Sequence, residues 1–188
     1  MRFCRILVAP RALMNEEGKK ETMRLSRIPL GLMGLVVVIA WARYAGAQEV
    51  ADERARALAV VEASLEALSN EDMVAFTDFM IEEAASMRVA ERDGEVRYTV
   101  RTRSEWRADS LSVDIVERGF DPEVLISGPL AVVWLPYDIY VDGGWSHCGV
   151  DVATLVRIEG DWKIASLSWT VEQPPACKRH PDGPPAGR

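Results

Sequence analysis

The chain has 188 residues, of which 48% are hydrophobic, and a formal net charge of −7. This length suffices for one domain with a hydrophobic core. Residues 1–47 hold eight of the 22 basic residues and three of the 29 acidic ones, which leaves residues 48–188 with a net charge of −12. Because so acidic a surface repels phosphate backbones, the composition argues against nucleic acid as a partner.

The N-terminal segment has the layout of a secretory signal peptide. A basic stretch that begins at Met23 precedes an apolar run at 28–42 and the small-residue sequence Ala45-Gly46-Ala47. The apolar run is shorter than the roughly 20 residues that span a bilayer as a helix, which favours a signal peptide over the alternative, a signal anchor. We predict a signal peptide over 23–47, cleaved after Ala47, and a periplasmic or secreted bacterial protein without a stable membrane anchor. Residues 1–22 are interpreted as an N-terminal extension or a misplaced start.

Two helices are predicted to follow. The stretch from Glu49 to Ser69 lacks Gly and Pro, and its apolar residues recur at helical spacing. These residues are Leu58, Val61, Leu65 and Leu68. Ser69 followed by Asp72 resembles a capping box that starts a second helix, which we expect to end near Ala85.

The remainder of the chain has the pattern of strands. Asp93-Gly94 predicts a short hairpin, 104–109 one or two helical turns, and 111–126 a further strand. From Leu130 to Val171, three runs rich in Val, Ile, Thr, Tyr and Trp are separated by two Gly-containing turns, which predicts an antiparallel meander. Helices followed by strands indicate an α+β fold. We expect a cone-shaped, curved antiparallel sheet with the N-terminal helices packed on its concave face.

The turns predict which residues share a face of the meander. If Gly143-Gly144 and Gly160-Asp161 form two-residue loops, alternate residues separate into two faces, and one face is almost wholly apolar. The other face is mixed. Its polar end contains Trp134, Asp138, Tyr140, His147, Asp151, Ser166, Ser168 and Thr170, and its apolar end Leu155, Trp162 and Ile164. Such a face is typical of a pocket wall, and also of a solvated sheet.

Asp151 and His147 are the candidate catalytic residues. If Asp151 points into the cone, burial raises its pKa and it could act as a general base, whereas a hydrogen bond to Thr170 would make it structural. His147 is either an acid–base group or a hydrogen-bonded sheet histidine. Four residues along a strand span about 13 Å, which excludes a direct dyad. The candidate ligand-pocket residues are Trp134, Asp138, Tyr140, Ser168 and Thr170.

Cysteine positions predict a disulfide. Export would place Cys148 and Cys177 in an oxidising compartment, and Pro174-Pro175 could turn the chain back so that the two meet. The alternative is two free buried thiols. Because the sequence has no Cys/His cluster and no Gly-rich phosphate loop, we predict neither a metal nor a cofactor.

The order of elements and the residues from Gly128 to Ile164 resemble a known family. The matching positions are Gly128, Trp134, Tyr137, Gly149, Asp151, Leu155, Gly160 and Trp162-Lys163-Ile164. They are similar to secreted bacterial members of the nuclear transport factor 2-like (SnoaL-like) family, some of which are described as lumazine-binding. The resemblance covers roughly 50–171 and implies a domain at 48–177, followed by a tail at 178–188 that we expect to be disordered.

The resemblance implies several functions, because the family includes isomerases, dehydratases, cyclases and non-catalytic binding or assembly domains. We expect an exported single-domain protein that binds a small, partly hydrophobic ligand in the cone. One alternative is a lyase or isomerase that uses Asp151 or His147 as general base, and another is a non-catalytic dimerisation or assembly module. The apolar sheet surface that the helices leave uncovered predicts a homodimer.

Overall fold

The computed structural model describes residues 30–185. The chain divides into two compact units, Met1–Trp41 and Ala42–Arg188, and the description below concerns the second. The first helix, α1, spans Leu30–Ser69, so the predicted cleavage position after Ala47 lies inside it. The predicted extension and the first residues of the predicted signal peptide lie outside the described residues. None of the described helices is long and apolar enough to cross a membrane.

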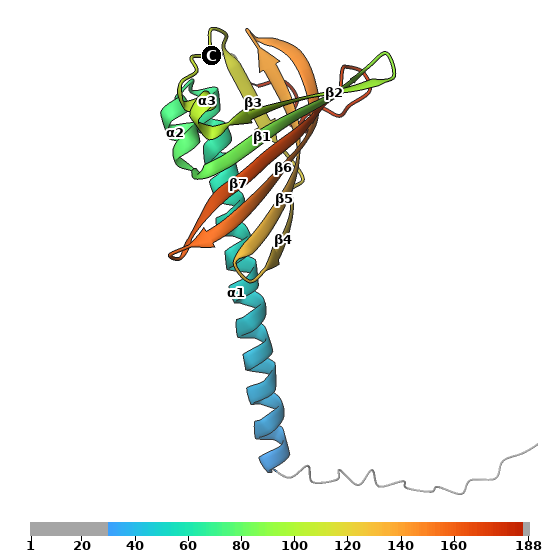
Figure 1. Cartoon of the computed structure of the whole chain (residues 1–188). Coiled ribbons are helices and arrows are strands. Elements are labelled where there is room, and N and C mark those ends of the chain that lie inside the picture. The colour runs from blue at the N-terminus through green and yellow to red at the C-terminus, as the bar shows by residue number, and fades with distance from the viewer. Residues whose placement is uncertain (1–29, 186–188) are drawn as a thin grey trace, which may run out of the picture. The chain divides into compact units, whose positions relative to one another are not determined.

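Within residues 30–185, two short helices and seven strands follow α1 (Figure 1). They are α2 (Met73–Asp78), β1 (Met80–Arg92), β2 (Glu95–Thr102), α3 (Arg103–Arg107), β3 (Ile115–Gly119), β4 (Glu123–Ser127), β5 (Leu130–Val141), β6 (Gly144–Ile158) and β7 (Asp161–Val171). The predicted α+β class, the Asp93-Gly94 hairpin and the three-stranded meander are confirmed.

The strands form one curved sheet in the order β2-β1-β7-β6-β5-β3, with β4 also paired to β5 (Figure 1). The pair β1–β7 is parallel and the others are antiparallel, so the expectation of a purely antiparallel sheet is wrong for this pair. A parallel neighbour requires a long crossover connection, and here β2 through β6 supply it. The sheet therefore brings residues near 88 next to residues near 169.

Two predicted elements have different boundaries. The second helix ends at Asp78, well before Ala85, because residues from Met80 onward pair with β7 on one side and β2 on the other. This pairing overrides the helix propensity of the Glu- and Ala-rich segment. The predicted strand at 111–126 is divided into β3 and β4, since Asp121 adopts a φ of 48° and Pro122 follows it.

The side of the sheet that faces α1, here called the inner face, carries the core. Ala57, Val61 and Leu65 of α1 are buried against strand residues. The strand residues are Val133 and Leu135 of β5, Leu155 of β6 and Ile164 of β7. Glu53 of α1 fixes the helix further, because its carboxylate accepts hydrogen bonds from Arg157 at 2.9 Å and from the Trp162 indole at 3.0 Å.

Both meander loops lie one residue earlier than predicted. The loop residues are Asp142-Gly143 and Glu159-Gly160, with φ values of 50°, 76°, 54° and 96°. Two consecutive positive φ angles define the tight hairpin turn that matches strand twist, and Asp, like Gly, tolerates this conformation. The predicted register is therefore wrong. A bulge in each hairpin shifts the pairing once more.

The corrected register changes the composition of the two faces. Asp151 pairs with Leu135 and Trp169, and His147 pairs with Ile139. Alternate residues of a strand point to opposite faces, so Asp151 shares the inner face with the apolar residues rather than with Thr170. A one-residue slip has this effect on every side chain of a strand.

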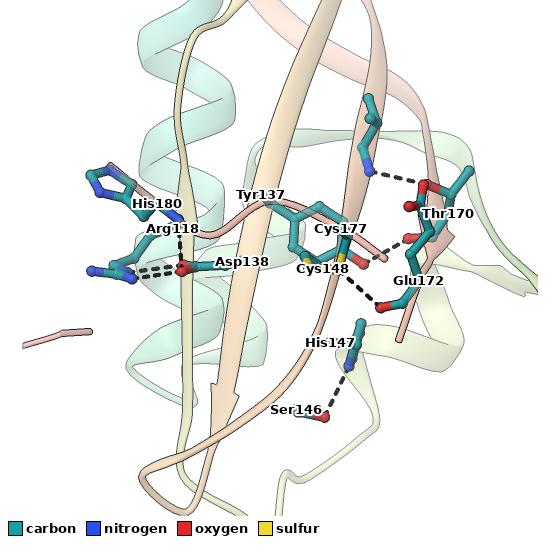
Figure 2. Close-up of a disulfide and its surroundings, with 11 residues drawn as sticks. Arg118, Tyr137, Asp138, Ser146, His147, Cys148, Thr170, Glu172, Cys177 and His180 are labelled. Atoms are coloured by element: carbon teal, nitrogen blue, oxygen red, sulfur yellow. Dashed lines mark hydrogen bonds and ion pairs between the residues drawn. A yellow bond between two sulfur atoms is a disulfide. The ribbon is translucent and has the colours of Figure 1, made fainter. Parts of the chain in front are cut away.

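The predicted disulfide is present: Cys148 and Cys177 are joined, with their Cα atoms 5.9 Å apart (Figure 2). Residues beyond the bridge contact the sheet. The guanidinium of Arg179 lies 3.6 Å from the ring centre of Trp145, and the His180 N–H donates to Asp138 at 3.0 Å. These contacts place Arg179 and His180 beside the sheet, and the expected disorder of 178–188 stays a prediction.

Candidate functional site

The inner face encloses a cavity of about 210 Å³. Its apolar lining consists of Leu65, Leu68, Phe76, Trp106, Leu111, Ile115, Ile139, Leu167 and Trp169. Five polar side chains join them: Arg88, Glu117, Tyr137, His147 and Asp151. Apolar cavities of about 150 Å³ in proteins hold benzene, so this one can hold a molecule with a single ring.

Three lining residues lie in one row across the sheet. Arg88 of β1 pairs with Trp169 of β7, which in turn pairs with Asp151 of β6. With strands about 4.8 Å apart, the backbones of Arg88 and Asp151 are about 10 Å from each other. Asp151 is only 2% exposed, whereas Arg88 is exposed. The row therefore runs from the solvent side of the cavity to its interior, with an indole ring between the two ends.

At the interior end, the carboxyl groups of Asp151 and Glu117 are close enough that each shifts the pKa of the other. Two neighbouring buried carboxylates would repel each other, so the pair is stabilised when one of the two groups carries a proton. Burial raises the pKa of Glu117 to about 7. Burial, followed by the neighbouring Glu117 charge, raises the pKa of Asp151 well above its ordinary value. The pair therefore retains a proton at neutral pH.

The carboxyl oxygen Oδ2 of Asp151 is buried and has no hydrogen-bond partner within the described part of the chain. Buried polar atoms are nearly always paired in folded proteins. An unpaired atom on a cavity wall is therefore where a ligand group would bind.

His147 and Tyr137 form the wall beside this pair. Burial, and then the positive charge of Arg88, lower the pKa of His147, so its imidazole is neutral at pH 7. Its Nδ1 lies 2.9 Å from the hydroxyl of Ser146 (Figure 2). Burial raises the pKa of Tyr137, whose hydroxyl donates to the Thr170 carbonyl at 2.8 Å. The Tyr137 hydroxyl therefore already has a hydrogen-bond partner, and the His147 imidazole is an uncharged part of the cavity wall.

The close approach of β6 to β7 at this point depends on a glycine, Gly149 of β6. A Cβ at Gly149 would collide with the Thr170 carbonyl oxygen that accepts the Tyr137 hydroxyl. Any side chain at this position would push β7 away.

The structure separates the predicted site residues into two groups. His147 and Asp151 line the cavity, but the five predicted pocket residues do not. Those five are Trp134, Asp138, Tyr140, Ser168 and Thr170. The one-residue register error accounts for the difference, because it placed both groups on a single face.

In the other group, Asp138 and Thr170 have structural contacts. Trp134 is 49% exposed. The Thr170 hydroxyl accepts the Val150 N–H at 3.0 Å. Asp138 is fully buried and accepts two hydrogen bonds from Arg118, at 3.0 and 2.7 Å (Figure 2).

Two cavity residues, Glu117 and Arg88, were not identified from the sequence. Glu117 follows Ile115-Val116, and an acid in such an apolar strand is a signal that could have been used. Arg88 carries no comparable signal. Its place beside Trp169 results from the parallel pairing of two segments far apart in the chain.

Comparison of the sequence with known family models and with curated proteins gave no match. Comparison with solved structures gave matches. A nuclear transport factor 2-like protein with a cystatin-like fold from Novosphingobium aromaticivorans aligns with 72% of this chain and 92% of its own, at 12% identity and a TM-score of 0.57. The domain has the nuclear transport factor 2-like fold.

Two further solved structures are similar to this chain, and the first of them is also described as nuclear transport factor 2-like. A protein of unknown function from Shewanella baltica is 15% identical, with a TM-score of 0.50 over 65% of this chain and 96% of its own. A candidate scytalone dehydratase from Novosphingobium aromaticivorans is 10% identical, with a TM-score of 0.52 over 67% and 89%. At such identities the likeness concerns the fold, and function has to be argued from the cavity.

Proposed function

We propose that this nuclear transport factor 2-like domain binds a small, partly hydrophobic molecule in its inner cavity. The unpaired Oδ2 of Asp151, on the wall of an otherwise apolar cavity, is the observation that carries the proposal. Leaving a buried polar atom unpaired costs about 1–3 kcal/mol. A hydroxyl or carbonyl group of a ligand would remove this cost, while its apolar part would contact Leu167 and Trp169.

Native mass spectrometry of the protein isolated from its own cells tests the proposal. We expect a retained small molecule in the wild type and none in Leu111→Trp, whose larger ring fills the cavity. Leu125→Trp is the matched control, because Leu125 is 66% exposed on β4 and does not line the cavity. An empty wild-type protein would contradict the proposal and favour the assembly module.

The carboxyl pair also favours a second candidate, a lyase or isomerase. A general base works best when its pKa is near the working pH, and burial brings Glu117 to about 7. Asp151 would remove a proton next to a carbonyl group, and neutral His147 could donate or accept one. Exchange of such protons into deuterated water would be followed by NMR with small hydrophobic ketones. Loss of the exchange in Asp151→Asn, with ligand binding retained, would establish catalysis.

We propose that the protein acts in an oxidising compartment outside the cytoplasm. The Cys148–Cys177 disulfide supports this proposal, because such bonds persist where thiols are not kept reduced. N-terminal sequencing of the protein from its own cells should find Gln48 first, in the periplasmic or secreted fraction. A cytoplasmic protein that retains Ala47 would contradict it.

We also propose a homodimer. Outward-facing apolar side chains support it, since Leu125, Leu130 and Trp134 are 66%, 45% and 49% exposed. A second copy could cover them. Light scattering during size exclusion at micromolar concentration should give twice the chain mass, and a monomer would contradict the proposal.

A further inference from the structure

We propose that the ligand of the cavity is a small monocarboxylic acid that carries an uncharged hydroxyl or carbonyl oxygen at its opposite end. The carboxylate would pair with Arg88, and the uncharged oxygen would bind at Asp151. This inference rests on the proposed binding function and specifies the chemistry of the ligand.

Arg88 is the group that would bind the ligand's carboxylate. Its neighbours Arg101, Arg103 and Arg107 each have a carboxylate partner, at 2.8, 2.8 and 2.6 Å. Among the described residues, no carboxylate forms an ion pair with Arg88. Its side chain nevertheless lines the cavity, and after burial its charge is what lowers the pKa of His147. An arginine beside an apolar cavity, in no ion pair of the described chain, is suited to a ligand carboxylate, which it can bind through two parallel hydrogen bonds.

The carboxyl pair determines which group of the ligand can bind at the interior end. Burial keeps a proton on the pair of Asp151 and Glu117, and the negative charge that remains on the pair would repel a second one. The interior end therefore excludes the ligand's carboxylate and leaves it only the Arg88 end. An uncharged oxygen is not repelled. It can accept a hydrogen bond from the protonated carboxyl group, or, as a hydroxyl, donate one to the unpaired Oδ2 of Asp151.

The row across the sheet sets the length of the ligand. The backbones of Arg88 and Asp151 are about 10 Å apart, with the Trp169 indole between them. A single ring with one polar group at each end spans this distance once the two side chains reach inward. Such a molecule also fits a cavity of about 210 Å³.

Three probes separate the two ends: para-hydroxyphenylacetate, its amide, and phenylacetate, each titrated into the full chain by calorimetry. In the wild type we expect the hydroxy acid to bind about tenfold more tightly than its amide, as for a charge-assisted pair. Arg88→Gln should abolish this difference. Arg97→Gln, a 68% exposed arginine on the adjacent strand, is the matched control and should preserve it.

The interior end is tested by the hydroxyl group. Asp151→Leu, which cannot form a hydrogen bond at this position, should abolish the preference for the hydroxy acid over phenylacetate and leave the preference for acid over amide intact. Equal binding of acid and amide to the wild type overturns the inference, and so does a difference that survives Arg88→Gln. Both results would still show that the cavity binds the amide, so the proposed binding function would remain supported. Absence of binding by all three probes also overturns the inference, and a molecule retained from the cells would then show that the cavity still binds a ligand.

Discussion

Asp138 and Asp151 lie on adjacent strands, on opposite faces of the sheet, and are equally inaccessible at 0% and 2% exposure. Asp138, on the outer face, is surrounded by donors: two from Arg118 and the N–H of His180 (Figure 2). Asp151, on the inner face, has another acid, Glu117, as its partner and one oxygen without any described partner.

The comparison shows that burial alone does not identify a functional acid. A buried carboxylate with a cation and further donors is stable as a charge and holds structure together. A buried carboxyl beside another carboxyl keeps a proton and is unstable as a charge, which is the arrangement found at many functional sites. The outer aspartate is closed off by the chain after Cys177, and the inner one is left facing a cavity.

The largest effect is expected from breaking the outer pair. Asp138→Asn removes the charge that compensates Arg118, and breaking a partly buried ion pair costs about 3 kcal/mol. Urea denaturation should show this loss in the free energy of unfolding. Asp93→Asn, at an exposed hairpin tip, should change it by less than about 0.5 kcal/mol. A loss as small as that of the control would mean that the outer pair is not structural.

Removing the disulfide should have an effect of similar size. The bridge closes a loop over a sequence separation of 29 residues, for which the constraint on the unfolded chain is worth about 3.5 kcal/mol. Replacing both Cys148 and Cys177 by Ser should lower the free energy of unfolding by about this amount. A thiol reductant should destabilise the wild type equally and leave the double variant unchanged. Insensitivity of the wild type to reductant would count against a structural disulfide.

The inner pair should respond to pH in the opposite sense to ordinary surface acids. The unfolded chain releases the protons of Asp151 and Glu117 near pH 4, whereas the folded pair retains a proton to about 7 or above. The native state therefore binds more protons between these values, so its stability falls as the pH rises. Each retained proton contributes up to about 1.4 kcal/mol per pH unit.

The double variant Asp151→Asn, Glu117→Gln should lose this slope. Denaturation curves between about pH 5 and 8 measure it as the difference from the wild type. The contribution of His147, whose lowered pKa acts in the reverse direction, is present in both proteins and cancels. Parallel curves for the two proteins would show that the pair does not hold the proton.

The sequence could predict features that local patterns determine. The amphipathic helix through Val61, the meander between Leu130 and Val171, and the Cys148–Cys177 pairing follow from periodicity, turn residues and spacing. The carboxyl pair could not be predicted, because Glu117 and Asp151 meet only through the pairing of β3, β5 and β6. Local rules do not determine such long-range pairings.

The error in the site came from a single residue in each turn. The glycine pair predicts a loop at 143–144, but Asp142 adopts a positive φ and is the first loop residue. This choice depends on how the strand twist and the buried face fit together over the whole sheet. His147 and Asp151 line the cavity, whereas the predicted register places them on one face with Asp138 and Thr170, which lie on the opposite face.

The smallest effect is expected on ligand binding, from substitutions of two consecutive residues of β7 that test the strand register directly. Ser168 and Trp169 are consecutive on β7, and only Trp169 lines the cavity. Trp169→Ala should weaken binding of para-hydroxyphenylacetate by at least about tenfold, because the ring forms the floor between Arg88 and Asp151. Ser168→Ala, on the opposite face, should change it by less than about twofold. Because strand neighbours point to opposite faces, the predicted register requires the reverse order of effects, so calorimetry on these two variants decides between the two registers.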